Sequence, residues 1–313
     1  MRYVAYEQSK SSPNIVVDGA ANDGTELVLS HWPNSATAAD LRADLSAQIV
    51  FNYLDRPELH VSADAVTNNH FDADGLVGTY ALTNPLEAAA IRDSLIDIAA
   101  AGDFDVYQNR DAARISFVLD AWAQPANSPL NKTVFAQDYA SVANVLYEEL
   151  LPRFPKIIQK VDYLERFWIA QDQHLDASEA AFSNGHFKLQ EIAQHDLAIV
   201  TMPDSNSTPA NSVHRMAIHN QTNCMRILLM QENNYELYYR YETWVDYHSR
   251  VLTKRKDLKL LAEKLTKQES MDGVWSFGGI NDLSPALKLT GAPLSKISFD
   301  SFKSQILEFL MEE

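Results

Sequence analysis

The chain has 313 residues, with 42 acidic against 26 basic side chains, which gives a formal net charge of −16 at pH 7. A chain of this length can bury a sizeable core and often forms two domains. The net charge repels polyanions, and proteins that hold duplex nucleic acid usually present a basic face. We therefore expect no duplex nucleic acid among its partners, and a ligand that contains phosphate would need local cations.

Hydrophobic residues make up 46% of the chain, but no run of about 18 apolar residues occurs, so we expect no transmembrane helix and no membrane partner. The first residues lack the apolar centre of a signal peptide. The single cysteine, Cys224, excludes an internal disulfide and a metal site built from cysteines. Together these features predict a cytoplasmic protein, or one that leaves the cell by a route that needs no N-terminal signal.

The first part of the chain mixes strands with many helices. Short apolar runs bounded by turn residues predict strands at 14–17, 26–29 and 64–67. Apolar residues at helical spacing predict helices at 37–54, 76–82, 85–102 and 112–122, and across 140–182 with breaks at Pro152 and Pro155.

The character of the sequence changes near residue 185. Strands are predicted at 186–202, 212–219, 225–230 and 235–247, and helices at 258–265 and 299–310. We therefore expect an α/β protein with a sheet flanked by helices in residues 1–185 and a second, smaller α+β domain in residues 186–313.

A compact acidic motif lies between the third predicted strand and the helix that follows it. His70, Asp72 and Asp74 alternate there, so they can converge at the end of the strand. Asp and His are suitable ligands for Mn²⁺ or Mg²⁺, and α/β folds bind ligands at the carboxyl ends of strands. A polar turn in which an Asp only caps the helix is the simpler alternative. An EF-hand is excluded, because aligning Gly75 with the loop glycine puts Ala81 at the last ligand position.

The segment His70-Phe71-Asp72-Ala73-Asp74-Gly75 resembles the first motif of the DHH phosphoesterase superfamily. That superfamily includes single-strand exonucleases, phosphodiesterases of oligonucleotides and cyclic dinucleotides, and manganese-dependent pyrophosphatases. The resemblance implies that His70, Asp72 and Asp74 bind metal. The Asp-His-His triplet that names the superfamily is absent, and downstream only Gln171-Asp172-Gln173-His174 and Gln194-His195-Asp196 approach it.

Two upstream residues offer an alternative to the missing triplet if the motifs are permuted. Asp18 follows the first predicted strand and His31 follows the second, which by resemblance makes Asp18 a ligand and His31 a catalytic residue. The short link between these strands favours a hairpin, because parallel strands usually need a crossover of about a dozen residues or more. A hairpin would place the two residues at opposite ends of the sheet. Asp103, after the helix that stops near Gly102, resembles a further ligand of the superfamily.

The second domain offers a candidate phosphate grip. Many DHH enzymes have a smaller C-terminal domain with a Gly-Gly-His element and an arginine on a nearby strand. Gly278-Gly279 resembles this element, with Ile280 in place of the histidine, and Arg240 would supply the cation. Paired glycines also let the backbone approach an anion closely. We therefore expect Arg240, Gly278 and Gly279 to bind substrate.

These observations predict a two-domain hydrolase whose cofactor is Mn²⁺ (or Mg²⁺). The expected metal ligands are Asp18, His70, Asp72, Asp74 and Asp103, and the expected catalytic residues are His31 and Asp74. A water activated by the metal would hydrolyse a small phosphate ester or nucleotide-type substrate, such as a short single-stranded oligonucleotide. The alternative is a non-catalytic nucleotide- or metal-binding protein of the same fold.

Overall fold

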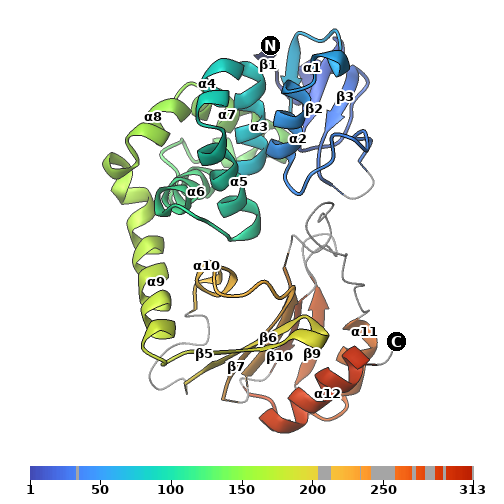
Figure 1. Cartoon of the computed structure of the whole chain (residues 1–313), viewed down its shortest axis with the longest axis vertical. Coiled ribbons are helices and arrows are strands. Elements are labelled where there is room, and N and C mark those ends of the chain that lie inside the picture. The colour runs from blue at the N-terminus through green and yellow to red at the C-terminus, as the bar shows by residue number, and fades with distance from the viewer. Residues whose placement is uncertain are drawn as a thin grey trace. The chain divides into compact units, whose positions relative to one another are not determined.

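A computed structural model describes residues 1–32, 35–203, 213–232, 234–240, 258–269, 273–278, 286–291 and 294–311. The predicted α/β class is confirmed, since a parallel sheet and a mixed sheet are both flanked by helices (Figure 1). Contacts divide the described residues into two compact units, residues 1–173 and a unit that begins at His174. The division falls inside helix α9 (Glu165–Ser183), whereas the sequence predicted it near residue 185.

The sheet of the first unit has four short strands, all parallel to their neighbours. They are β1 (Arg2–Tyr3), β2 (Asn14–Val17), β3 (Thr25–Leu29) and β4 (Ala65–Thr67), in the order β1-β4-β2-β3. Every residue of β2 and β4 is buried, as is usual for parallel strands covered on both faces. Because the strands are parallel, the segments that follow β2, β3 and β4 all leave from the same edge of the sheet.

The hairpin predicted between β2 and β3 is wrong, because the two strands are parallel. A strand of four residues is only about 13 Å long, so residues 18–24 are enough to return to its start. This connecting segment is tightly packed. Asp18 takes the left-handed conformation, with φ of 48°, and a Cβ on Gly24 would lie 2.4 Å from the carbonyl oxygen of Ser12. The usual crossover length therefore does not apply to strands this short.

The helices of the first unit begin and end close to the predicted positions, with three differences. The helix predicted at 37–54 begins only at Ser46, and the one predicted at 85–102 is divided at Ile91. Pro155, which was expected to break a helix, lies in the first turn of the helix Phe154–Gln159. None of the helices in the described part of the chain is long and apolar enough to cross a membrane. Besides α9, the unit contains α1 (Tyr6–Ser9), α2 (Ser46–Leu54), α3 (Ala73–Thr83), α4 (Pro85–Ala90), α5 (Arg92–Phe104), α6 (Arg110–Ala123), α7 (Tyr139–Leu150) and α8 (Phe154–Gln159), with 3₁₀ turns at Pro57–Leu59, Val134–Ala136 and Val161–Leu164.

Helix α3 is the central helix of this unit. Every residue from Ala73 to Leu82 is buried, because α2 and α5 both pack against it and its inner face lies on the sheet. A Cβ on Gly78 would lie 2.6 Å from Cγ1 of Val17, so only glycine allows α3 to lie this close to β2. The N-terminus of α3 is thereby held at the carboxyl edge of the sheet.

The second unit is a six-stranded mixed sheet in the order β5-β6-β7-β8-β10-β9, in which only β6 and β7 pair in parallel. Its strands are β5 (Lys188–Ile192), β6 (Leu197–Met202), β7 (Arg226–Gln231), β8 (Asn234–Tyr239), β9 (Val274–Gly278) and β10 (Ala286–Thr290). Its helices are α10 (Arg215–His219), α11 (Leu258–Thr266) and α12 (Phe299–Met311), with a 3₁₀ turn at Ala193–His195.

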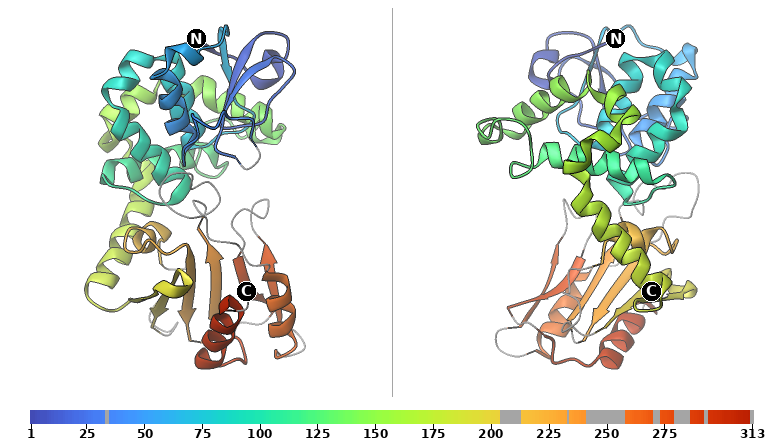
Figure 2. Two further views of the ribbon diagram at one scale, coloured as in Figure 1. Left: turned by 45° about the vertical axis from the view of Figure 1, so that its right-hand side comes forward. Right: turned by 90° about the vertical axis from the view of Figure 1, so that its left-hand side faces the viewer.

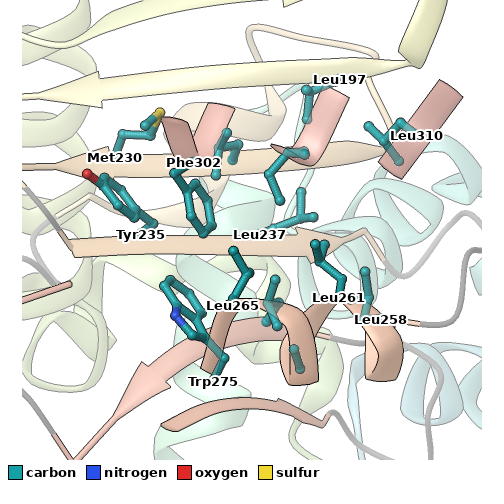
Figure 3. Close-up of a cluster of buried hydrophobic side chains, with 14 of the residues drawn as sticks. Leu197, Met230, Tyr235, Leu237, Leu258, Leu261, Leu265, Trp275, Phe302 and Leu310 are labelled. Carbon is teal, nitrogen blue, oxygen red and sulfur yellow. The ribbon is translucent and has the colours of Figure 1, made fainter. Parts of the chain in front are cut away.

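Side chains that alternate along these strands point to opposite faces of the sheet and pack into two separate hydrophobic cores. On one face, α11 and α12 cover a cluster that includes Tyr235, Leu237, Trp275 and Phe302 (Figure 3). Trp275 and Tyr235 both stack on the ring of Phe302, with centroid distances of 5.0 and 4.4 Å. The other face packs on the ends of α9 and α10 through a smaller cluster that includes Ile218. Figure 2 shows the strands of this sheet from two further directions.

Two strand predictions in this unit are corrected. The strand predicted at 186–202 is a hairpin of β5 and β6, interrupted by a turn in which Asp196 has a φ of 48°. The segment predicted as a strand at 212–219 instead contains helix α10. The start of this helix is capped by His214, whose Nδ1 accepts the N–H of Met216. The predicted strand 235–247 is observed as β8, which ends at Tyr239, and its part beyond Arg240 lies outside the described residues.

Candidate metal centre

The structure brings together all six residues that the sequence nominated in the first unit. Asp18 follows β2, His31 follows β3, and His70, Asp72 and Asp74 lie between β4 and the first turn of α3. Asp103 comes from the last turn of α5. Because β2, β3 and β4 are parallel, their ends meet at one edge of the sheet, where α/β folds bind ligands.

Two histidines face four carboxylates at this edge. Nε2 of His31 lies 3.4 Å from Oδ1 of Asp18, 3.5 Å from Oδ2 of Asp103 and 4.0 Å from Oδ2 of Asp74. The expectation that Asp18 and His31 would lie at opposite ends of the sheet is therefore wrong. It depended on an antiparallel pair, and the pair is parallel.

The second histidine contacts the other oxygen of the same aspartate. Nε2 of His70 lies 3.1 Å from Oδ2 of Asp18 and 2.7 Å from Oδ2 of Asp72. Asp18 therefore lies between two clusters, each of which has its possible ligand atoms within 4.8 Å of one another. We call them the His31 group (Asp18, His31 and Asp74) and the His70 group (Asp18, His70 and Asp72).

The orientation of His31 is set by its other ring nitrogen. Nδ1 lies 2.6 Å from the main-chain oxygen of Asp44, which can only accept a hydrogen bond. This contact assigns the proton to Nδ1 and directs the lone pair of Nε2 toward the carboxylates. Metal-binding histidines are commonly held in this way. Asp44 makes this contact through its backbone rather than its carboxylate.

Asp72 combines capping with a position in the cluster. It is the N-cap of α3, and its Oδ1 accepts the N–H of Gly75 at 2.8 Å, so Asp72 does cap the helix. Its Oδ2 is the atom that contacts His70. A Cβ on Gly75 would lie 2.5 Å from the Asn68 amide and 2.6 Å from the Tyr147 hydroxyl, so the turn requires glycine. The two roles of Asp72 use different oxygens and are compatible.

Asp74 is fully buried and is held by the start of helix α2. Its two carboxylate oxygens accept main-chain N–H groups from Ser46 at 2.7 Å and from Ala47 at 2.8 Å. Helix N-termini favour negative charge because their first N–H groups have no partner within the helix. This contact could not be predicted from the sequence, because the apolar pattern predicts a helix that begins at residue 37.

Ser46 is a functional candidate that the sequence reading missed. Its hydroxyl donates to Oδ1 of Asp18 at 2.7 Å and accepts the main-chain N–H of His31 at 3.0 Å. Serine is a common residue at the start of a helix, and that was the signal available. Asp103 reaches the site because Gly102 lets α5 approach α3 closely, as a Cβ there would lie 2.4 Å from the Cβ of Ala73.

Burial and mutual repulsion dominate the electrostatics of the cluster. Burial and the charge of Asp18 raise the pKa of Asp74 to about 7, and burial together with the charges of Asp72, Asp74 and Asp18 raises the pKa of Asp103 well above its ordinary value. Burial alone would raise the pKa of Asp18, but the hydrogen bond and charge of His70 hold it below its ordinary value. Burial alone would lower the pKa of His70, but the charges and hydrogen bonds of Asp72 and Asp18 raise it to about 12.

Four carboxylates against two imidazoles leave this edge with an excess of negative charge. Within the described residues, every ion pair of these four carboxylates is made to a histidine, and none to Lys or Arg. A divalent cation would compensate the excess. Carboxylate oxygens with some imidazole nitrogen suit Mn²⁺ or Mg²⁺, so the donor set fits the predicted metal.

The other nominated residues lie elsewhere. Arg240 is buried in the second unit, and its Nη1 donates to the main-chain oxygen of Thr222 at 2.7 Å. Gly278 is the last residue of β9, and Gly279 lies outside the described residues. Asp172, from the downstream Asp-His segment, is not part of the cluster, because it pairs with Nε of Arg110 at 2.6 Å and Nη2 of Arg114 at 3.1 Å.

Comparison with known proteins identifies the family to which this chain belongs. The model of a family described as a family of unknown function (DUF6687) matches residues 1–308, and the chain belongs to that family. The matched residues include both compact units of this chain. No curated protein and no solved structure matches the chain.

Proposed function

We propose that this protein is a metal-dependent phosphoesterase that hydrolyses a small phosphate ester or a nucleotide-type substrate. The observation that carries the proposal is the convergence of Asp18, Asp72, Asp74 and Asp103 with His31 and His70 at the carboxyl edge of a parallel sheet. An arrangement of buried carboxylates around two imidazoles, without Lys or Arg among its ion pairs in the described residues, favours a divalent cation.

The strand order supports the resemblance to the DHH superfamily. The strand before His70 lies beside the strand that ends at Asp18, and that strand lies beside the one that ends at His31. Residues that are permuted in the chain are thus neighbours at one sheet edge. By resemblance, His31 would correspond to the histidine pair of the superfamily and Asp103, 3.5 Å from its Nε2, to the later acidic ligand.

The residues have distinct roles in the proposed site. Asp18, His70, Asp72, Asp74 and Asp103 would hold Mn²⁺ or Mg²⁺, which when bound neutralises charge on the phosphoryl oxygens and lowers the pKa of water. Nε2 of His31 faces the carboxylates, which suits His31 to a catalytic role at the metal, and Asp74, whose pKa is about 7 without metal, is able to hold a proton near neutral pH. Because Asp74, Asp103 and His70 bind protons in the metal-free protein, metal binding should release protons.

The second unit is proposed to contribute to substrate binding. By resemblance to the superfamily, Arg240 and the paired glycines Gly278 and Gly279 would bind a phosphate group. A guanidinium and the backbone N–H groups of paired glycines are donors that can hydrogen-bond to phosphate oxygens. The proposed setting is the cytoplasm, and the proposed substrates are small phosphorylated molecules or short single-stranded oligonucleotides.

Calorimetric titration of the full chain with Mn²⁺ tests the metal centre. We expect saturable binding with proton release, and a large loss of affinity in Asp72→Ala and Asp74→Ala. Asp93→Asn is the matched control, because Asp93 is an exposed carboxylate in the first turn of α5 and lies outside the cluster. Absence of binding, or equal binding by the two alanine variants and the wild type, would refute the metal centre.

Turnover separates the enzyme from the non-catalytic alternative. The full chain with Mn²⁺ is offered pyrophosphate, cyclic dinucleotides and short single-stranded oligonucleotides, and the released product is measured. The proposal expects hydrolysis of at least one class, abolished by chelator and by Asp74→Ala. Metal binding without hydrolysis of any of these would favour a nucleotide- or metal-binding protein of the same fold.

A further inference from the structure

One residue contacts every member of the His31 group. The hydroxyl of Ser46 donates to Oδ1 of Asp18 at 2.7 Å and accepts the main-chain N–H of His31 at 3.0 Å. The main-chain N–H of the same residue donates to Oδ2 of Asp74 at 2.7 Å. Ser46 is fully buried, so solvent does not compete for these three hydrogen bonds.

We infer that Ser46 is a positioning residue that builds the His31 group before metal arrives and makes the two groups unequal in affinity. This inference rests on the proposed metal centre. Ser46 would not contact the metal itself. It holds an aspartate, a histidine and a second aspartate from three different elements at one point, which reduces the reorganisation needed when a cation binds.

Hydrogen bonds from surrounding residues fix the members of the His31 group. His31 is fixed by the Asp44 oxygen at Nδ1 and by Ser46 at its backbone. Asp74 accepts two main-chain hydrogen bonds from the start of α2. Asp18, His31 and Asp74 are all at most 3% exposed. Since the ligand atoms are already ordered, a cation bound there gives up little free energy to arranging them.

The His70 group lacks this support. Nδ1 of His70 is buried and has no hydrogen-bond partner among the described residues, in contrast to Nδ1 of His31. Its ring lies beside Trp32, with a centroid distance of 5.0 Å, which gives packing but no orienting hydrogen bond. The side chain of Asp72 is 34% exposed. Asp72 is held by the N–H of Gly75 and Asp18 by Ser46, but the ring of His70 lacks an orienting hydrogen bond at Nδ1 among the described residues, so we expect a cation to bind this group less tightly.

The test is a two-site calorimetric titration of the full chain with Mn²⁺. We expect two classes of binding in the wild type. Ser46→Ala should weaken the tighter class by roughly 10- to 100-fold, as loss of an outer-shell partner typically does, and weaken the weaker class clearly less, because the two groups share only Asp18. Asp72→Asn is the reciprocal variant and should weaken only the weaker class. Ser46→Thr keeps the hydroxyl and should restore tight binding relative to Ser46→Ala.

The readout distinguishes positioning from general structural support. A merely structural serine would lower the midpoint of thermal unfolding without changing Mn²⁺ affinity in the folded protein. Equal weakening of both classes by Ser46→Ala, or no weakening in a folded variant, overturns the inference, and so does loss of the tighter class in Asp72→Asn. Absence of any Mn²⁺ binding by the wild type would instead refute the metal centre on which the inference rests.

Discussion

Replacing Asp103 by asparagine should stabilise the metal-free protein while weakening its hold on metal. Asp103 is the simplest of the four carboxylates to neutralise, because its one ion pair among the described residues joins Oδ2 to Nε2 of His31 at 3.5 Å. The change removes a negative charge without removing a hydrogen bond. Burial and the charges of Asp72, Asp74 and Asp18 raise the pKa of Asp103, which means that its charged form is disfavoured in the folded state.

The size of the gain follows from the geometry. Oδ2 of Asp103 and Oδ1 of Asp18 both lie within 3.5 Å of the same nitrogen of His31, so the two oxygens are at most about 7 Å apart. Two like charges at about 7 Å repel by roughly 2 kcal/mol at an effective dielectric constant of about 20. Attraction to the imidazoles offsets part of this, so we expect a gain of about 1–2 kcal/mol in the free energy of unfolding.

Urea unfolding at pH 8 measures the free energy of unfolding of the wild type and of Asp103→Asn, first with chelator and then with excess Mn²⁺. At a metal concentration of about 100 times Kd, the wild type should gain about 2.7 kcal/mol from Mn²⁺, and Asp103→Asn should gain clearly less. The control Asp93→Asn, on the same helix, should lose about 0.3–1 kcal/mol because it removes a favourable charge from the helix N-terminus, with an unchanged gain from Mn²⁺. Loss of stability by Asp103→Asn in chelator, with the full gain from Mn²⁺, would refute the reasoning.

We make three further predictions, on the pH dependence of stability, on Gly102 and on Asp172. In chelator, the free energy of unfolding should fall as the pH rises from about 4 to 7, because the pKa of Asp74 is about 7 in the folded protein and 3.8 ordinarily. It should keep falling above about pH 6.5, because the pKa of His70 is raised to about 12. Both groups bind more protons in the folded state; a rise in stability over this range, measured by urea unfolding from pH 4 to 9, would contradict the charge balance. Gly102→Ala should destabilise the protein by about 1–3 kcal/mol and weaken Mn²⁺ binding, because the added methyl would meet Ala73 and displace α5; unchanged calorimetric affinity would contradict this. Asp172→Asn should destabilise the protein by about 1–3 kcal/mol through its two arginine pairs and leave Mn²⁺ affinity as in the wild type, since this aspartate lies outside the cluster; calorimetry with thermal unfolding checks both.

Much of the cluster could be predicted from the sequence because the signals are local. Strands that end in Asp18 and His31, and a strand followed by His70, Asp72 and Asp74, are visible as short apolar runs with polar residues directly after them. Helix boundaries were less visible. The start of α2 at Ser46 was hidden because apolar residues at helical spacing continue upstream of it.

Strand direction was the main failure, and its cause is physical. The rule that a short link means a hairpin assumes strands of ordinary length, whereas β2 has four residues and can be retraced by residues 18–24. The error mattered, because it separated Asp18 from His31 and left Asp18 as a doubtful ligand. Similarly, residues 212–219 were read as a strand where Arg215–His219 form a helix, since segments this short show no distinct period.

The residue types that can bind a divalent cation, and their places after strands, were present in the amino-acid sequence alone. Which of them meet was settled by folding, because the decisive contacts join residues far apart in the chain. Ser46 and Asp74 are 28 positions apart, and no local pattern connects them. Parallel pairing of β2, β3 and β4 places all three strand ends at one edge, and the close packing of α3 against α5 adds Asp103. Local periodicity reports which elements form, while strand direction and helix packing depend on the burial of the whole chain.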